Sequence, residues 1–322
     1  MKHLKMIPAP LFTAFLVLTH PLNLRASEHQ LQPEYSGGVR LLSESELPES
    51  IAKQLGQILV RREAPEPESY MISWGLSGFV EPETDYLIGP WGPVKNFLPY
   101  SGLGESFSGA ARTGKKPDHM TMEGYWRYAS KKKFSDSNIL GGNEDLFVQS
   151  KNVWIPEAKT TAENLSWYGA KLISHGDVIR FETDVALPVA QMSIGKHYSE
   201  NYLQDKALGG GFYLEYHDRP HFHMPVDRNA GGFLILGKIL KKREGQQGFR
   251  ATIALSAFKI PYGRAIYTGL NVLHDDGLLT GNYAVVYSVT ENFSTVILKE
   301  QGSQRLAKVR VTKMEDAPGL NE

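Results

Sequence analysis

The fold and the candidate chemistry of this chain are decided by residues 209–227, "GGGFYLEYHDRPHFHMPVD". Three of the chain's ten histidines, His217, His221 and His223, fall within this stretch. Side chains two positions apart in a β-strand point to the same face. We therefore expect His221 and His223 to lie on one face and Phe222 to point into a core on the other. The sequence "HFH" predicts two imidazoles that are aimed at one point.

The strand that precedes this pair carries Glu215 and His217 on one face. Pro220 is expected to bend or end that strand, and spacing alone leaves open whether His217 joins the pair. Asp227 follows the second proline of the stretch and could turn its carboxylate back toward the same point. Imidazoles with a carboxylate suit one divalent ion, Fe(II), Mn(II), Zn(II) or Ni(II), with open positions for substrate or oxygen. The alternative is that these are ordinary loop histidines beside prolines.

The segments that flank this stretch indicate a mostly β protein. Short runs rich in β-branched and aromatic residues follow one another between Gly, Asn and charged turns, among them "GGFLILGKIL", "GFRATIALSAFKIPYG", "GLLTGNYAVVYSVT" and "FSTVILKE". Such a series, with little helical period, predicts an antiparallel sandwich or barrel. Its expected extent is residues 181–300, followed by a C-terminal tail, 301–322.

The N-terminal half has a different texture. Residues 27–65 are expected to form an arm and one amphipathic packing helix, since Ile51, Leu55, Ile58 and Leu59 share a helical stripe. Residues 66–180 contain all five tryptophans and read as an irregular β region, either an extra sheet layer or a degenerate first barrel. Large rings of this kind usually fill a core, and a sugar-stacking platform is the alternative.

Further along the chain, "FKIPYGRAIYTGLNVLHDDG" places a Pro-x-Gly turn at Pro261 and Gly263, followed by His274. Together with His221 and His223, this region resembles the cupin superfamily. The resemblance implies a double-stranded β-helix, or jelly-roll, barrel that holds one divalent metal. Two histidines and a carboxylate would come from the first motif, and one histidine from the second. Dioxygenase and isomerase or lyase chemistry are both compatible with such a site, and pairing of barrels through their sheets suggests a homodimer.

The resemblance assigns the carboxylate to Asp227 and the second-motif histidine to His274. Two positions depart from the family pattern, because Ile266 stands where that histidine is common and Glu215 stands where a glycine is usual. Glu215 and His217 are reserve ligands, and an all-histidine site that includes His217 and His274 stays open. The candidate metal ligands are His221, His223, Asp227, His274, Glu215 and His217.

The Pro-x-Gly turn also supplies candidate catalytic residues. Tyr262, Arg264 and Tyr267 flank the turn, where residues at the mouth of a barrel would lie. A guanidinium there could hold a substrate carboxylate in a bidentate pair, and a tyrosine could donate a proton. The alternative is that the tyrosines pack and that Arg264 is solvated.

Composition excludes several function classes. The chain has no cysteine, which excludes disulfides, zinc-thiolate sites and cysteine nucleophiles. Lys+Arg and Asp+Glu both number 35, so no basic excess points to nucleic acid. The sequence contains no Gly-x-Ser-x-Gly nucleophile elbow and no phosphate-binding loop with its lysine.

The first 26 residues have the pattern of a secretory signal peptide. A short basic head precedes an apolar stretch and a small-residue cleavage point after Ala26. We therefore expect an exported protein, periplasmic or secreted, with no membrane span after removal of the signal. The sequence favours an exported metalloenzyme acting on a small organic molecule. A non-catalytic barrel that binds a small ligand or carbohydrate, or a secreted interaction protein, is the alternative.

Overall fold

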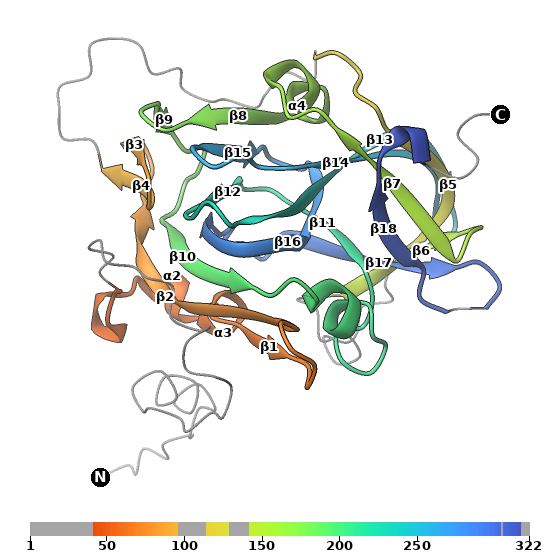
Figure 1. Cartoon of the computed structure of the whole chain (residues 1–322), viewed down its shortest axis with the longest axis horizontal. Helices are drawn as coiled ribbons and strands as arrows, with labels where there is room; N and C mark the ends of the chain where they lie inside the picture. Colours follow the sequence, from red (N-terminus) through yellow and green to blue (C-terminus); the bar gives the residue numbers. More distant parts are fainter. Residues whose placement is uncertain (1–40, 96–113, 129–141, 304, 317–322) are drawn as a thin grey trace.

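The computed structural model describes residues 41–95, 114–128, 142–303 and 305–316, and strands account for most of its regular structure (Figure 1). This confirms the expected mostly β fold class. The predicted signal peptide lies outside the described residues, and no helix within them is long and apolar enough to cross a membrane. The helical segments are η1 Glu44–Glu46, α2 Glu49–Ala52, α3 Leu55–Ile58, α4 Ala162–Tyr168, the π-helix η2 Ser199–Leu203 and η3 Met314–Asp316.

Seven of the described strands pair into a closed ring. Its order is β16 (Leu273–Val286), β11 (Tyr213–His217), β17 (Phe293–Glu300), β6 (Gly142–Val148), β5 (Met120–Arg127), β14 (Gly248–Phe258) and β13 (Gly231–Gly245), which returns to β16. One cluster of buried apolar side chains draws on every strand of the ring, and also on β7 (Asn152–Ala158) and β18 (Lys308–Thr312). The ring therefore surrounds an apolar core.

A second set of strands shares β16 with the ring. Its order is β1 (Arg61–Glu63), β2 (Tyr70–Val80), β10 (Leu187–Ile194), β16, β12 (His221–Pro225), β15 (Arg264–Thr268) and β8 (Ala170–Ser174). The first part of β16 pairs with β11 and β13, and residues 281–286 pair with β10. Gly281 lies where the strand changes partners; its φ is 90°, and a Cβ there would lie 2.5 Å from Cα of Ala230. Only glycine fits this change of direction without strain.

The larger apolar core lies against this second sheet. Phe222 is fully buried in it, as strand parity predicts. The predicted amphipathic helix is present as the short helices α2 and α3, which bury Ile51, Leu55 and Ile58 in the same core. A small sheet of β4 (Gly92–Lys95), β3 (Asp85–Gly89) and β9 (Val178–Arg180) lies at the left in Figure 1.

Strands from the tryptophan-rich region and from the expected barrel region pair with one another. β2 pairs with β10 in the second sheet, and β5 and β6 pair with β14 and β17 in the ring. Trp126 is 1% exposed and fills the core of the ring, while Trp91 and Trp167 pack against the larger core. These three rings have the packing role that was expected for most of the tryptophans.

Candidate metal centre

The candidate metal centre lies where the ring and the second sheet meet at β16. Strand β11 ends at His217 in the ring and β12 begins at His221 in the second sheet, which agrees with the predicted break at Pro220. Glu215 pairs directly with His274 across β11 and β16. Side chains that are opposite one another on antiparallel strands are in contact range. His217, two positions after Glu215, points to the same side.

Four side chains converge at this corner, and we call them the ligand group: Glu215, His217, His221 and His274. One potential ligand atom from each lies within 4.8 Å of the others. Nε2 of His274 is 3.2 Å from Oε1 of Glu215 and 3.1 Å from Nδ1 of His221. The three imidazoles are buried, and the Glu215 side chain keeps 15% of its exposure. A carboxylate and three imidazoles are a ligand set that divalent transition metals accept.

Backbone carbonyls fix the tautomers of two of these imidazoles. Nδ1 of His217 donates to the carbonyl of Arg219 at 2.6 Å, and Nδ1 of His274 donates to the carbonyl of Val272 at 2.9 Å. A carbonyl only accepts, so each Nδ1 carries a proton, and Nε2 of the neutral ring presents a lone pair to the centre. Nε2 of His274 can also carry a proton and donate it to Oε1 of Glu215. Nε2 of His217 has no partner among the described residues. Histidines that bind metals are usually oriented in this way by their second nitrogen.

Burial and neighbouring charge shift the pKa values of the ligand group. Burial, reinforced by the neighbouring imidazoles, lowers the pKa of His217 to about 3 and that of His221 well below its usual value. Burial also lowers the pKa of His274, but the hydrogen bond and the charge of Glu215 outweigh it and the net pKa is raised. Two imidazoles are thus held neutral, the form that binds a metal. At the third imidazole, His274, either a proton on the ring or a bound cation can balance the negative charge of Glu215.

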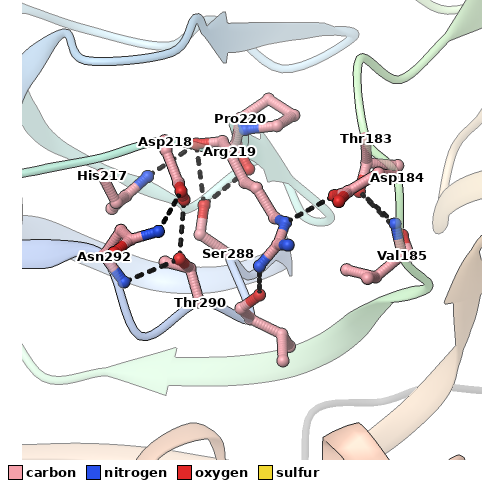
Figure 2. A network of polar contacts seen from close by, with 11 residues as sticks. Thr183, Asp184, Val185, His217, Asp218, Arg219, Pro220, Ser288, Thr290 and Asn292 are labelled. Atoms are coloured by element: carbon pink, nitrogen blue, oxygen red, sulfur yellow. Dashed lines mark hydrogen bonds and ion pairs between the residues drawn. The ribbon is translucent and has the colours of Figure 1, made fainter.

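The turn at residues 218–220 is held from inside by side chains that follow β16 (Figure 2). The carboxylate of Asp218 accepts hydrogen bonds from Oγ1 of Thr290 at 2.6 Å and from Nδ2 of Asn292 at 2.8 Å. Both bonds involve an ionised acceptor, which makes them stronger than neutral ones. Asp218 is therefore fixed directly next to His217, the last residue of β11.

Arg219 and Pro220 complete the same network (Figure 2). Oγ of Ser288 lies 3.0 Å from the carbonyl oxygen of Arg219 and 2.8 Å from that of Pro220, and it can donate to either. The guanidinium of Arg219 donates to Asp184 at 2.9 Å and to the carbonyl of Val289. The turn thus sets the spacing between the end of β11 and the start of β12, and with it the positions of two ligands.

A second polar cluster adjoins the ligand group. In this Asp276 cluster, the hydroxyl of Tyr213 donates to Oδ1 of Asp276 at 2.7 Å, and Nε2 of His223 lies 3.3 Å from Oδ2. Burial raises the pKa of Asp276, but the hydrogen bonds from His223 and Tyr213 outweigh it and hold the pKa below its usual value. His223 lies on the same side of β12 as His221, with ring centroids 5.5 Å apart. Its hydrogen-bond partner, however, is Asp276 and not a member of the ligand group.

Asp227 also lies outside the ligand group. Its Oδ1 accepts from the backbone N–H groups of Asn229 at 2.7 Å and Ala230 at 2.8 Å, and its Oδ2 accepts from Nδ2 of Asn282 at 2.6 Å. Bonds of this kind, from an aspartate to the backbone two or three residues on, stabilise turns. The structure thus gives Asp227 a role in the turn between β12 and β13.

The predicted catalytic residues lie on and beside β15. Tyr262 is exposed, and Nη1 of Arg264 donates to Oγ of Ser174. Tyr267 is buried, and its hydroxyl accepts from the backbone N–H of Glu182 at 3.2 Å. None of the three belongs to the wall of the pocket that opens from the ligand group.

That pocket has a volume of about 710 Å³, the part open to solvent included. Its wall includes all of the ligand group except His274, and also Gln54, Gln57, Ile58, Val60, Arg62, Met71, Tyr213, Asp276, Tyr287, Ser288, Thr290 and Phe293. Small-molecule sites commonly have this mixture of apolar wall and few polar groups. Helix α3 and strand β1 therefore form one side of the pocket, in addition to packing on the core.

Several polar residues of this site were missed in the sequence, among them Asp276, Tyr213, Arg62 and Tyr287. Asp276 and Tyr213 could have been found by parity, because each lies two positions from a member of the ligand group on the same strand. Arg62 and Tyr287 carried no such signal. They reach the pocket from the start of the chain and from the end of β16, and no local pattern specifies that these segments meet.

No family model, no curated protein and no solved structure matches this chain. The comparisons therefore supply no function for the site.

Proposed function

We propose that this chain is a metalloenzyme that binds one divalent ion at Glu215, His217, His221 and His274. The observation that carries the proposal is the convergence of four buried or nearly buried ligand atoms within 4.8 Å. In their neutral form, two of the imidazoles present Nε2 lone pairs, because their Nδ1 protons are engaged by carbonyls. Fe(II), Mn(II), Zn(II) and Ni(II) suit this set. When bound, such an ion supplies Lewis-acid or oxygen-activating chemistry, of the dioxygenase or the isomerase or lyase type.

We also propose that the fold is a cupin-like double-stranded β-helix, and residue spacing supports this. The pattern first sought at His221, His223 and Asp227 recurs six residues earlier at Glu215, His217 and His221. The glycine usual six positions before the first ligand is then present, as Gly209. In this register the carboxylate comes first and the histidines follow, with His274 from the second motif.

Tyr287 is the proton donor that we assign to the pocket. Its ring packs edge-on against His221, with centroids 5.4 Å apart. Burial, together with the charge of Asp276, raises the pKa of Tyr287 well above its usual value, so its hydroxyl stays protonated. That hydroxyl lies 2.9 Å from Sδ of Met192, a weak acceptor, and can therefore donate to a bound substrate instead. Glu215 contributes the negative charge that holds the cation.

The signal pattern of residues 1–26 supports export, and we propose that the enzyme acts in the periplasm or outside the cell on a small organic molecule. The homodimer implied by the cupin resemblance stays a prediction. Elution volume in size-exclusion chromatography with light scattering would test it.

Metal content tests the proposed function. Purified protein should contain about one transition-metal ion per chain, measured by plasma mass spectrometry after dialysis against each candidate metal. His217→Leu removes a ligand, so its affinity should fall by more than the 10–100-fold typical of losing an outer partner of a ligand. His223→Asn is the matched control: it changes a buried histidine on the same side of β12, and should keep the metal. A wild-type protein without stoichiometric metal, or equal losses in both variants, would rule out this site.

A further inference from the structure

Strand β1 places two arginines in opposite environments. Arg61 and Glu63 point outward and pair with one another, Nη2 to Oε2, at 3.0 Å. Arg62, between them, points inward by parity, is half-buried and lies in the wall of the pocket beside the ligand group. Arg61 thus has its counter-charge on the surface, while Arg62 carries its charge into the pocket.

The guanidinium of Arg62 has few partners. Its Nη1 lies 3.4 Å from the hydroxyl of Tyr198 and 3.9 Å from Sδ of Met71, both long contacts to weak or neutral acceptors. Within the ranges that the structure describes, no carboxylate forms an ion pair with Arg62, and its other N–H groups make no hydrogen bond. A guanidinium has five donors in a planar fork and is always charged. Most of the fork is therefore available to the pocket.

The other charges of the pocket are already engaged. Glu215 contacts His274 and faces the proposed cation, and both carboxylate oxygens of Asp276 have partners in Tyr213 and His223. A half-buried cation without a counter-ion is unfavourable, so the group that the pocket lacks is an anion. One planar fork matches a singly charged carboxylate in two parallel hydrogen bonds. A phosphate group carries nearly two negative charges. The single guanidinium of Arg62 would balance only one of them, and the carboxylates of Glu215 and Asp276 would repel the group.

We propose that the substrate is a small organic acid whose carboxylate pairs with Arg62, while the rest of the molecule extends toward the ligand group. This names the substrate class of the metal site and rests on the proposed function above. The amides of Gln54 and Gln57 and the hydroxyl of Tyr287 line the same pocket and can bind the remaining polar atoms. Arg62 is a positioning residue for the substrate, and its loss should affect anion binding and leave metal binding unchanged.

The test is calorimetric titration of acetate, succinate and inorganic phosphate at constant ionic strength, on metal-free and on metal-loaded protein. Arg62→Gln should weaken succinate binding by at least about tenfold, as expected for losing a hydrogen-bonded charge pair. Arg61→Gln, the neighbouring exposed arginine, should bind like wild type. Arg62→Lys keeps the charge but not the planar guanidinium, so its affinity for succinate should lie between those of wild type and Arg62→Gln. This variant keeps the test valid if Arg62→Gln folds poorly. Metal content is measured on every sample.

The outcomes separate the two proposals. A wild-type protein that binds neither carboxylate more tightly than Arg62→Gln does overturns the inference, even if the metal is present. Tighter binding of phosphate than of succinate, dependent on Arg62, also overturns it. Succinate binding that depends on Arg62 in a protein that takes up no metal would leave the organic-acid site standing and remove the proposed metalloenzyme.

Discussion

The ligand group and the Asp276 cluster lie side by side in one buried polar region, and each combines histidine with a carboxylate. In the Asp276 cluster, a tyrosine hydroxyl and an imidazole supply a donor for each oxygen of Asp276. In the ligand group, carbonyls engage the Nδ1 protons of His217 and His274, and the charge of Glu215 is balanced only by a proton on His274 or by a cation. The chain completes the first cluster with its own donors. The second can take a positive charge, as a proton on His274 or as a cation, and this distinguishes a structural polar cluster from a site for a cation.

The largest effect should come from breaking the Asp276 cluster. In metal-free protein, Asp276→Ala leaves His223 and Tyr213 buried without their acceptor, and should cost about 3–5 kcal/mol of unfolding free energy. Urea unfolding measures this cost. Asp275→Ala is the control, because Asp275 is the neighbouring residue, is also fully buried, and has no side-chain hydrogen-bond donor among the described residues. Removing an unpaired buried carboxyl should cost less than about 1 kcal/mol.

The ligand group should respond in the opposite way to the same measurement. In metal-free protein, His217→Leu replaces an imidazole whose Nε2 is unpaired, and the carbonyl of Arg219 keeps Ser288 as a donor. The free energy of unfolding should therefore stay within about 1 kcal/mol of wild type. With metal at 100 times its dissociation constant, wild type should gain about 2.7 kcal/mol and the variant far less. Equal costs for His217→Leu and Asp276→Ala in metal-free protein would abolish the distinction between the clusters.

Local periodicity predicted the parts of this region that depend on neighbours in sequence. Parity placed His221 and His223 on one side of a strand and Phe222 in the core, and Pro220 separates two strands. The mostly β class followed from the same short, β-branched segments. These features depend on backbone geometry within a few residues, which the sequence specifies directly.

Pairing between distant strands could not be predicted in this way. Glu215 meets His274 because β11 and β16 are neighbours, and a period of two residues does not say which strand pairs with which. Gly281 lies within the predicted strand segment "GLLTGNYAVVYSVT", but the sequence does not show that the strand passes from one sheet to the other at this glycine. Arg62 likewise reaches the pocket only because β1 pairs with β2 at the edge of the second sheet.

A substitution that weakens the turn between β11 and β12 should have an intermediate effect on stability. The turn positions two members of the ligand group but belongs to neither cluster. Thr290→Val removes a hydrogen bond to Asp218 at nearly constant shape. It should cost about 1–2 kcal/mol of unfolding free energy and lower metal affinity by about 10–100-fold. Thr183→Val is the control: its hydroxyl bonds only its own turn, at Val185, so stability should fall while metal affinity holds. Unchanged affinity in Thr290→Val would show that the turn does not set the ligand positions.

The smallest effect should come from Asp184, the outermost member of the network in Figure 2. Its side chain is 77% exposed, so its ion pair with Arg219 should contribute less than about 1 kcal/mol. The hydrogen bond from Arg219 lowers the pKa of Asp184. The folded-state pKa thus lies below the unfolded value of about 3.9, and the contribution is present above that value and is lost as pH falls through the folded pKa. Urea unfolding of wild type and Asp184→Asn should therefore differ slightly near neutral pH, and converge in acid or at high salt. Because Thr290 and Ser288 also hold the turn, the metal content of Asp184→Asn should equal that of wild type. A loss of metal in this variant would show that the exposed ion pair between Asp184 and Arg219 is needed to position the ligand group.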